Sequence, residues 1–294
     1  MGHWQSITKT WLVGLAAFVA LAGCAVSAPP SEPSTQPSVT TTASPASVPP
    51  TTAVPTVTPS GTPTSTATAP PACPKPASGF VTKAPGKGRT VALTFDDGPG
   101  PADREIVTVL DRYGVHATFF ETGAHAAANP DITRTLAAHG ELIADHSWGH
   151  YYPTQVKGGW TPDYLRSQLT RTNSELASLT GQPVCYFRPP GGFRENVLAA
   201  AGRQRMSAVL WSVDSEDWKQ PPRTTKAATR RIIANATATS GDAHPIVLMH
   251  SAKASHEPES RVSSYRGNTV AALPAVIEWY RAHGYRFVTL AGTS

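Results

Sequence analysis

The sequence predicts an α/β fold in which a parallel sheet of seven strands is closed, or nearly closed, into a barrel within a single domain. Short apolar runs alternate with longer amphipathic runs between Phe80 and Ser294, and the connections between them are short. Unusual polar residues follow several of the apolar runs. This placement agrees with a β/α barrel, because the chemistry of such folds gathers at the carboxyl ends of the strands.

The short apolar runs are expected as strands. A complete barrel of this type has eight strands, so a count of seven predicts an incomplete version. The expected strands are Thr90–Thr94, Ala117–Glu121, Glu141–Ala144, Val184–Phe187, Ser207–Trp211, Ile246–Met249 and Arg286–Leu290.

The longer amphipathic runs between the strands are expected as helices. Asn196 and Asn268 suit N-cap positions at the start of two of them. Four glycines suit helix ends, namely Gly114, Gly140, Gly181 and Gly284. The expected helices are Asp103–Tyr113, Pro130–His139, Pro162–Leu179, Asn196–Arg203, Thr224–Thr237 and Asn268–His283.

The first residues have the pattern of a bacterial lipoprotein signal peptide, expected over residues 1–23. Lys9 precedes an apolar run, Trp11–Ala22, which has the length of a secretory signal and is too short for a comfortable membrane span. Small residues then lead to Cys24, whose thiol can carry lipid after cleavage before it. An ordinary signal peptide cut nearby is the alternative. The lipoprotein interpretation predicts a secreted protein anchored to the outer face of the bacterial membrane.

Residues 24–79 are expected as a linker outside the folded domain. From Ala25 to Ser78 nearly all residues are Pro, Ser, Thr, Ala and Val, and the only charged residues are Glu32 and Lys75. Such a segment cannot bury enough apolar surface to offset its ordering entropy. A semi-stiff proline-rich tether and a glycosylated stalk both agree with this composition.

Residues 80–294 are long enough for one domain with a sizeable core, and a monomer is expected. The net charge of +5 is mild, and no basic run is interleaved with aromatic residues. This pattern excludes a nucleic-acid partner and agrees with a polyanionic surrounding such as a cell wall. If Cys24 is lipidated, Cys73 and Cys185 remain as a pair, for which a disulfide is favoured over two free thiols.

Two polar clusters follow expected strands. Asp96 and Asp97 lie in TFDDGP, where adjacent carboxylates repel unless positive charge lies nearby, and a solvated acidic turn is the alternative. His146 and His150 lie in HSWGH, where a spacing of four lets both rings reach one metal ion if the segment turns helically. Two imidazoles with a carboxylate form a catalytic type of zinc site, and no cysteine is available for a thiolate site.

Five motifs occur in order along the domain: TFDDGP at Thr94–Pro99, HSWGH at His146–His150, RPPGG at Arg188–Gly192, DSEDW at Asp214–Trp218 and LMHS at Leu248–Ser251. On these motifs the sequence resembles the polysaccharide deacetylase family, the NodB-homology domain, over nearly all of Val91 to Leu290. The resemblance implies a distorted (β/α)7 barrel, which agrees with the strand count.

The resemblance also implies the role of each residue on the metal side of the site. Asp97, His146 and His150 are expected to bind the metal ion. Asp96 is expected to be the general base that takes a proton from the attacking water. Arg188 is expected to pair with Asp96 and to hold it ionised, and a surface ion pair is the alternative for this arginine.

On the leaving-group side, the resemblance implies that His250 is the general acid and that Asp217 raises its pKa. Trp218 and Leu248 are expected to line a small apolar pocket for the acetyl methyl group, with a plain core position as the alternative for the tryptophan. A backbone N–H near Gly191 is expected to help bind the oxyanion.

Some positions depart from the family pattern. Gly191 stands where an aromatic residue is common, so we expect a more open wall of the substrate groove there. Ser251 stands where an aspartate is common, and a polar insertion, Ala252–Gly267, follows it. This insertion places His256, Glu257, Glu259, Arg261 and Arg266 beside the expected site, and we expect it to be solvated, with contact to the substrate as the alternative. Asp214 is expected only to support its loop.

The implied activity is metal-dependent hydrolysis of N-acetyl groups on a cell-wall aminosugar polymer, with peptidoglycan N-acetylglucosamine first and a chitin-like oligosaccharide next. The metal is expected to be zinc, while cobalt, nickel and manganese stay open because these ligands accept them all. The expected partners are the acetylated polysaccharide and the membrane. An acetylxylan esterase, a non-catalytic wall-binding protein and a metal-supply lipoprotein are the alternatives, and the complete motif set argues against the last two.

Overall fold

The computed structural model describes residues 72–294. The expected signal peptide, Cys24 and most of the expected linker lie outside these residues. In the described part, none of the helices is both long enough and apolar enough to cross a membrane.

A parallel sheet forms the centre of the domain, in the order β5-β4-β3-β2-β1-β7-β6, with β8 beside β1. β5 and β6 stand at opposite ends of this order but are consecutive in the chain, so the sheet curls into a half-barrel. The predicted distorted barrel is therefore confirmed. The strands are β1 Thr90–Asp96, β2 Thr118–Glu121, β3 Leu142–Asp145, β4 Tyr186–Phe187, β5 Ser207–Ala208, β6 Val213–Asp214, β7 Ile246–His250 and β8 Arg286–Phe287.

The expected strand Ser207–Trp211 is wrong in one respect, because the structure replaces it with β5 and, after a gap, β6. The backbone changes partners within this gap. Val209 N–H donates to Phe187 O of β4, whereas Ser212 N–H donates to Ile246 O of β7. The segment therefore crosses from one end of the sheet to the other and cannot continue as one strand.

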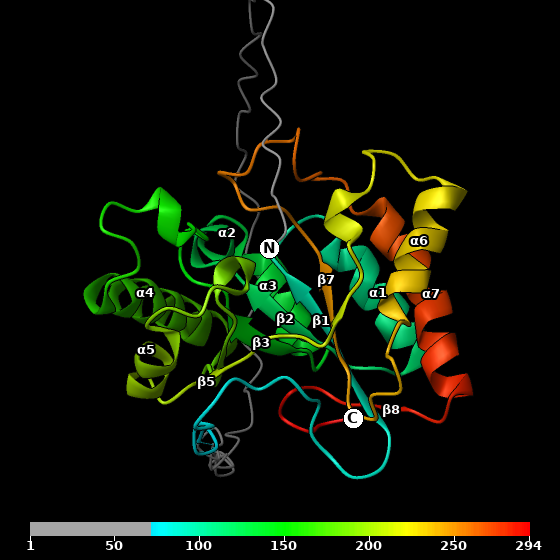
Figure 1. Cartoon of the computed structure of the whole chain (residues 1–294), viewed down its shortest axis with the longest axis horizontal. Coiled ribbons are helices and arrows are strands. Elements are labelled where there is room, and N and C mark those ends of the chain that lie inside the picture. Colours follow the sequence, from blue (N-terminus) through cyan, green and yellow to red (C-terminus); the bar gives the residue numbers. More distant parts are fainter. Residues whose placement is uncertain (1–71) are drawn as a thin grey trace, which may run out of the picture. The chain divides into compact units, whose positions relative to one another are not determined.

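All six expected helices are present, with ends displaced by at most two residues, and Figure 1 shows α4 and α5 on one side of the sheet with α1, α6 and α7 on the other. The short α2, which is rich in alanine, was not expected from the sequence. The α-helices are α1 Asp103–Tyr113, α2 Gly123–Ala128, α3 Pro130–Ala138, α4 Pro162–Thr180, α5 Val197–Arg203, α6 Lys226–Ala236 and α7 Gly267–Ala282. Three 3-10 helices are η1 Pro153–Gln155, η2 Pro190–Gly192 and η3 Asp217–Lys219.

The expected N-cap at Asn268 is wrong. The helix α7 begins one residue earlier, after Arg266, and Asn268 lies buried in its first turn. Its side chain instead accepts a hydrogen bond from the Thr225 N–H and donates to the carbonyl oxygens of Pro221 and Arg223. Asn268 therefore joins α7 to the segment before α6.

The alternation of side chains along β1 separates the two cores of the domain. Leu93 and Phe95 pack in the outer core between sheet and helices, whereas Ala92 packs in the inner core of the barrel. Because side chains alternate along a strand, Thr94 and Asp96 share the inner face with Ala92. The strand thus carries a carboxylate into the carboxyl-terminal mouth of the barrel.

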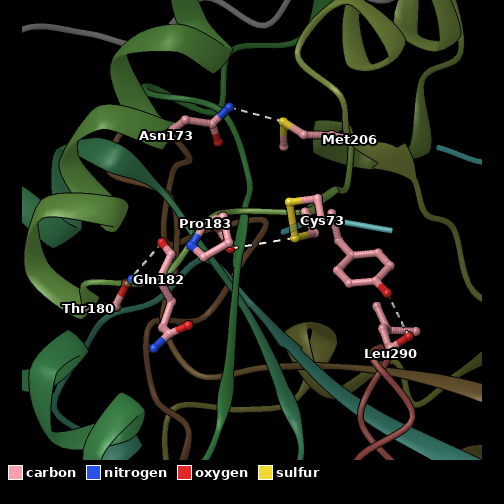
Figure 2. The surroundings of a disulfide bond; sticks show 9 residues. Cys73, Asn173, Thr180, Gln182, Pro183, Met206 and Leu290 are labelled. Carbon is pink, nitrogen blue, oxygen red and sulfur yellow. Dashed lines mark hydrogen bonds between the residues drawn. A yellow bond between two sulfur atoms is a disulfide. The ribbon is translucent and has the colours of Figure 1, made fainter. Parts of the chain in front are cut away.

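A disulfide joins Cys73 to Cys185, as the sequence analysis favoured, and Figure 2 shows its surroundings. Beyond it, the Ala77 N–H donates to the Ser207 hydroxyl and the Val81 N–H donates to Ala208 O. The residues after Cys73, which were expected as the end of the linker, are therefore held against the barrel.

Candidate active site

The polar residues that follow the strands converge on one cavity of about 160 Å³ at the carboxyl ends of the strands. Asp96 ends β1, His146 follows β3, and His250 ends β7. The lining residues are Asp96, Asp97, His146, His150, Tyr152, Gly191, Trp211, Asp214, Trp218, Leu248, His250, Glu257 and Val262.

Arg188 is fully buried beneath the cavity and fixes Asp96. Its Nη1 donates to Asp96 Oδ1 at 2.7 Å and to the Thr94 hydroxyl at 2.8 Å, and its Nη2 donates to Leu210 O at 3.2 Å. The guanidinium also lies 4.1 Å from the centre of the Phe120 ring. This arginine is therefore not a surface ion-pair residue. It orients one carboxylate oxygen and balances its charge, and its removal would leave that charge buried and unpaired.

Asp97, His146 and His150 form a buried group whose potential ligand atoms all lie within 4.8 Å of one another. His146 Nε2 lies 3.6 Å and His150 Nε2 lies 3.2 Å from Asp97 Oδ1. The Nδ1–H of His146 donates to Arg188 O at 2.8 Å, so its Nε2 keeps a free lone pair. Asp97 Oδ1 is buried and accepts no hydrogen bond from the described residues. The donor set fits a divalent transition metal.

His150 is held in its neutral form, which is the form that binds metals. Burial lowers its pKa well below the ordinary value, and the neighbouring rings of His146, His256, His250 and His125 lower it further.

The backbone around this group is in the left-handed region at residues other than glycine. Asp97 has a φ of 71°, Ser147 of 66° and His150 of 61°. Residues 146–150 form no helix, so the helical turn that was expected to bring His146 and His150 together is absent. Left-handed conformations of this kind persist where the surrounding structure determines them, and they cluster at functional sites.

His250, which is partly buried, and the buried Asp217 form a second pair in the same cavity. His250 Nδ1 lies 2.8 Å from Asp217 Oδ1, and the Thr269 hydroxyl donates to Asp217 Oδ2 at 2.8 Å. Burial by itself lowers the pKa of His250, but the charge and hydrogen bond of Asp217, with the charge of Asp97, outweigh it and raise this pKa to about 9. Burial would raise the pKa of Asp217, yet His250 and Arg266 bring it down to about 2. The imidazole is therefore charged at neutral pH.

Trp218 and Leu248 both line the cavity. Leu248 is buried, whereas Trp218 is half-buried and carries the Lys219 ammonium 4.7 Å from its ring centre. The tryptophan is therefore part of the cavity wall and not a plain core residue. Asp214 also lines the cavity, and its Oδ1 accepts the Glu216 N–H at 2.8 Å, which braces the loop as expected.

The wall at Gly191 is not open, contrary to the expectation from the sequence. A Cβ built on Gly191 would lie 2.9 Å from Tyr152 Cε1 and 3.1 Å from Phe193 Cε2. Gly191 also has a φ of 61°, which side chains rarely allow. The ring of Tyr152, from another segment, and that of Phe193, from the same segment, thus occupy the space beside this glycine and close the wall.

The insertion Ala252–Gly267 is solvated only in part, because Glu259 and Arg261 are exposed whereas other residues of the loop face the cavity. Glu257 and Val262 line the cavity, and the Tyr152 hydroxyl donates to Glu257 Oε1 at 2.5 Å. Arg266 is buried, and its guanidinium donates to the carbonyl oxygens of Ala252 and Ser263. Its buried guanidinium holds the two ends of the loop together.

The structure adds four lining residues to which no role was assigned from the sequence, namely Tyr152, Trp211, Glu257 and Val262. All four lie outside the five motifs. The only sequence signal was the unusual insertion after the last motif, together with the aromatic pair that follows HSWGH.

A carboxylate pair, two imidazoles beside one of these carboxylates and a separate imidazole–carboxylate pair surround one small cavity of a parallel β/α barrel. This arrangement defines the class of the protein as a hydrolase, with separate groups for activating water and for protonating a leaving group.

Comparison with known proteins identifies the family. A family model described as polysaccharide deacetylase matches residues 83–208. A peptidoglycan-N-acetylglucosamine deacetylase from Bacillus cereus is 34% identical over 202 residues, which are 68% of this chain and 66% of that relative. A chitooligosaccharide deacetylase from Rhizobium leguminosarum bv. trifolii is 30% identical over 205 residues, which are 69% of this chain and 90% of that relative. The chain belongs to the polysaccharide deacetylase family.

The solved structures agree with this assignment. The crystal structure of a CE4 family pseudoenzyme from Bacillus anthracis has a TM-score of 0.59 and 26% sequence identity, and the match covers 73% of this chain and 68% of that chain.

Proposed function

We propose that this chain is a metal-dependent deacetylase of N-acetyl groups on a cell-wall aminosugar polymer. Peptidoglycan N-acetylglucosamine is the first substrate of this proposal and a chitin-like oligosaccharide is the next, which follows the names of the two relatives. The observation that carries the proposal is that Asp96, fixed by Arg188, lies next to the Asp97–His146–His150 group, with the His250–Asp217 pair in the same cavity.

In this proposal Asp97, His146 and His150 hold a divalent transition metal, with zinc as the first choice and cobalt, nickel or manganese as others. The buried, unbonded Asp97 Oδ1 and the free lone pair of His146 Nε2 support this assignment. When bound, the metal polarises the acetyl oxygen and lowers the pKa of nearby water.

Asp96 then acts as the general base. Its Oδ1 is held by Arg188, whereas its Oδ2 lies 3.5 Å from His146 Nε2, on the side of the proposed ligands. One carboxylate oxygen is therefore fixed by a cation, and the other faces the position where water is activated. This geometry suits the removal of a proton from the attacking water.

His250 acts as the general acid, and Asp217 keeps it charged. An amine leaves poorly unless it is protonated, so a charged imidazole at the leaving group is the counterpart of the base at the water. The pair supplies one proton to the leaving nitrogen in each cycle.

The cavity is small enough to select an acetyl group. Trp218, Leu248 and Val262 provide apolar surface for a methyl group in a space of about 160 Å³. In this proposal the backbone N–H near Gly191 donates to the developing oxyanion.

The proposal includes the position of the enzyme in the cell. Cys24 carries lipid, residues 24–72 tether the domain, and a monomer faces the wall from the outer side of the membrane. This position agrees with peptidoglycan as the first substrate, because a tethered enzyme lies beside the polymer on which it acts.

A non-catalytic wall-binding protein is the second candidate, because one structural relative is a pseudoenzyme. A copy that has lost turnover is expected to lack part of the machinery. This chain keeps all five of the groups proposed to bind metal, take a proton or give one, namely Asp96, Asp97, His146, His150 and His250.

The test is the release of acetate by the purified chain with one equivalent of zinc. Acetylated peptidoglycan, chitin oligomers and acetylxylan are compared at equal acetyl content. We expect release from the two aminosugar polymers and little from acetylxylan. Release from acetylxylan alone would identify an O-acetyl esterase, and binding without release from any polymer would favour the second candidate.

A further inference from the structure

We propose that the loop 252–267 completes a second transition-metal site, formed by His150, His256 and Glu257. One nitrogen of each imidazole and one carboxylate oxygen lie within 4.8 Å of one another. This inference rests on the proposed function in one respect, because His150 is also a proposed ligand of the first ion, at Asp97, His146 and His150.

The strongest support comes from buried nitrogen atoms without hydrogen bonds. His150 is 4% exposed, and its Nδ1 has no partner among the described residues. Both ring nitrogens of His256 are buried in the same unpaired state. The contrast is His146, whose Nδ1–H donates to Arg188 O. A buried polar atom without a partner is costly, and an ion bound to one nitrogen of each ring would offset part of that cost.

The donor set and its supports suit zinc or a similar ion. Two imidazoles with one carboxylate are a common ligand set for such ions. The Tyr152 hydroxyl donates to Glu257 Oε1 at 2.5 Å, and ligating carboxylates are usually held by such a second hydrogen bond. His256 is held by aromatic packing, with its ring centre 4.8 Å from that of Tyr151 and 5.7 Å from that of Tyr152.

Further contacts hold the loop in place. His125 Nε2 lies 2.8 Å from the Ser255 hydroxyl, and its Nδ1–H donates to Asp97 O at 2.7 Å. The Lys253 ammonium donates to the backbone oxygens of Ala254 and Glu257 and not to the Glu257 carboxylate. The Glu257 carboxylate can therefore accept the hydrogen bond from the Tyr152 hydroxyl and also bind the proposed ion.

The two sites would share His150, with Nε2 on the first ion and Nδ1 on the second. A neutral imidazole carries one N–H, so binding of the second ion releases the Nδ1 proton to the solvent and leaves an imidazolate between the two ions. Two cations on one ring repel each other, so the second ion binds more weakly than the first. Its binding would fasten the loop that carries Glu257 over the cavity.

The test is the zinc content of the purified full chain after equilibrium dialysis against rising concentrations of Zn²⁺ alone. We expect two ions per wild-type chain, the second with the lower affinity. His256→Ala and Glu257→Gln should keep the first ion and lose the second. Glu259→Gln is the matched control on the same loop, because its carboxylate is bonded to the Ser264 N–H, and it should bind two. Tyr152→Phe should keep both and weaken the second about 10-fold.

A wild-type chain that saturates with one ion overturns this inference, and so does a second ion that survives in both ligand variants. Acetate release is measured in parallel with one equivalent of zinc. Two ions without acetate release would reject the proposed function and keep this site, whereas one ion with release would reject this site alone.

Discussion

Asp217 binds His250 twice, because its Oδ1 lies 2.8 Å from the imidazole Nδ1 and its Oδ2 accepts the backbone N–H of His250 at 2.9 Å. Because its pKa is brought down to about 2, Asp217 is ionised and accepts from both groups, and the contact with Nδ1 keeps a proton of the imidazole on that nitrogen. The other ring nitrogen is then the one that can give a proton to a substrate. The geometry of this pair therefore sets both the orientation and the charge of the proposed acid.

The first prediction separates amide from ester substrates. His250→Ala should reduce hydrolysis of N-acetyl groups by about 10²–10⁴-fold, the range for a lost general acid, and should reduce hydrolysis of O-acetyl esters much less. The reason is that an amine needs protonation to leave, whereas an alkoxide depends on it less. Asp217→Asn should show a milder form of the same bias. The measurement is the ratio of acetate release from chitin oligomers and acetylxylan, and equal losses on both would mean that His250 only stabilises charge or positions substrate.

The second prediction concerns pH. The pKa of His250 is raised to about 9, above the ordinary value, so the charged form is present below this pH and is lost as the pH rises through it. In the metal-free chain, the imidazole of His250 should titrate near this value by NMR. Amide hydrolysis should fall over the same alkaline limb. In Asp217→Asn the midpoint should move down, because burial then acts with little opposition. An unchanged midpoint in that variant would show that Asp217 does not set the charge.

The third prediction concerns the disulfide. Cys73 and Cys185 are 112 residues apart in the sequence, and a bridge over a long loop restricts the unfolded chain strongly. Replacing both by Ser should lower the free energy of unfolding in urea by about 2–4 kcal/mol. Acetate release in native conditions should stay close to wild type, since neither cysteine lines the cavity. Cys24→Ser, which keeps the bridge, is the control. A variant of equal stability would show that the bridge contributes nothing.

The fourth prediction concerns attachment. Cys24→Ala should release the protein from membranes or block its processing, because stable anchoring needs the acyl chains that this cysteine carries. Cell fractionation with an antibody to the domain measures the effect, and Cys73→Ala serves as the matched cysteine control. Membrane retention and processing equal to those of the unsubstituted chain would remove the lipoprotein proposal.

The sequence predicted the fold well because short apolar runs mark the strands and longer amphipathic runs mark the helices. Every helix with a clear amphipathic pattern is present, and Asp96, His146 and His250 fall at strand ends that parallel pairing brings together. The short α2 was missed because its alanines give little amphipathic signal. The expected strand at Ser207–Trp211 was wrong because local hydropathy does not show that the chain changes hydrogen-bond partners there.

A different reason explains why the wall at Gly191 and the loop 252–267 could not be predicted from the sequence. Tyr152 fills the space beside Gly191, and it also contacts Glu257, which is 105 residues away in the sequence. Arg266 is buried although its neighbours in the sequence are polar. Because both features depend on contacts between segments that are distant in the sequence, no local pattern of residues predicts them.

The last prediction tests the division of labour between the two adjacent carboxylates. Asp97→Ala and His146→Ala should lose the first bound metal and turnover together, and a chelator should do the same to the wild-type chain until a divalent transition metal is restored. Asp96→Asn should differ, because Asp96 is bonded to Arg188 and is proposed to be the base and not a ligand.

The most direct measurement is therefore zinc content together with acetate release from acetylated peptidoglycan and chitin oligomers, for wild type and Asp96→Asn at one equivalent of zinc. We expect both proteins to retain the ion and Asp96→Asn to lose about 10²–10⁴-fold in rate, the range for a lost general base. An Asp96→Asn chain that retains zinc and releases acetate at the wild-type rate would contradict the assignment of Asp96 as the base.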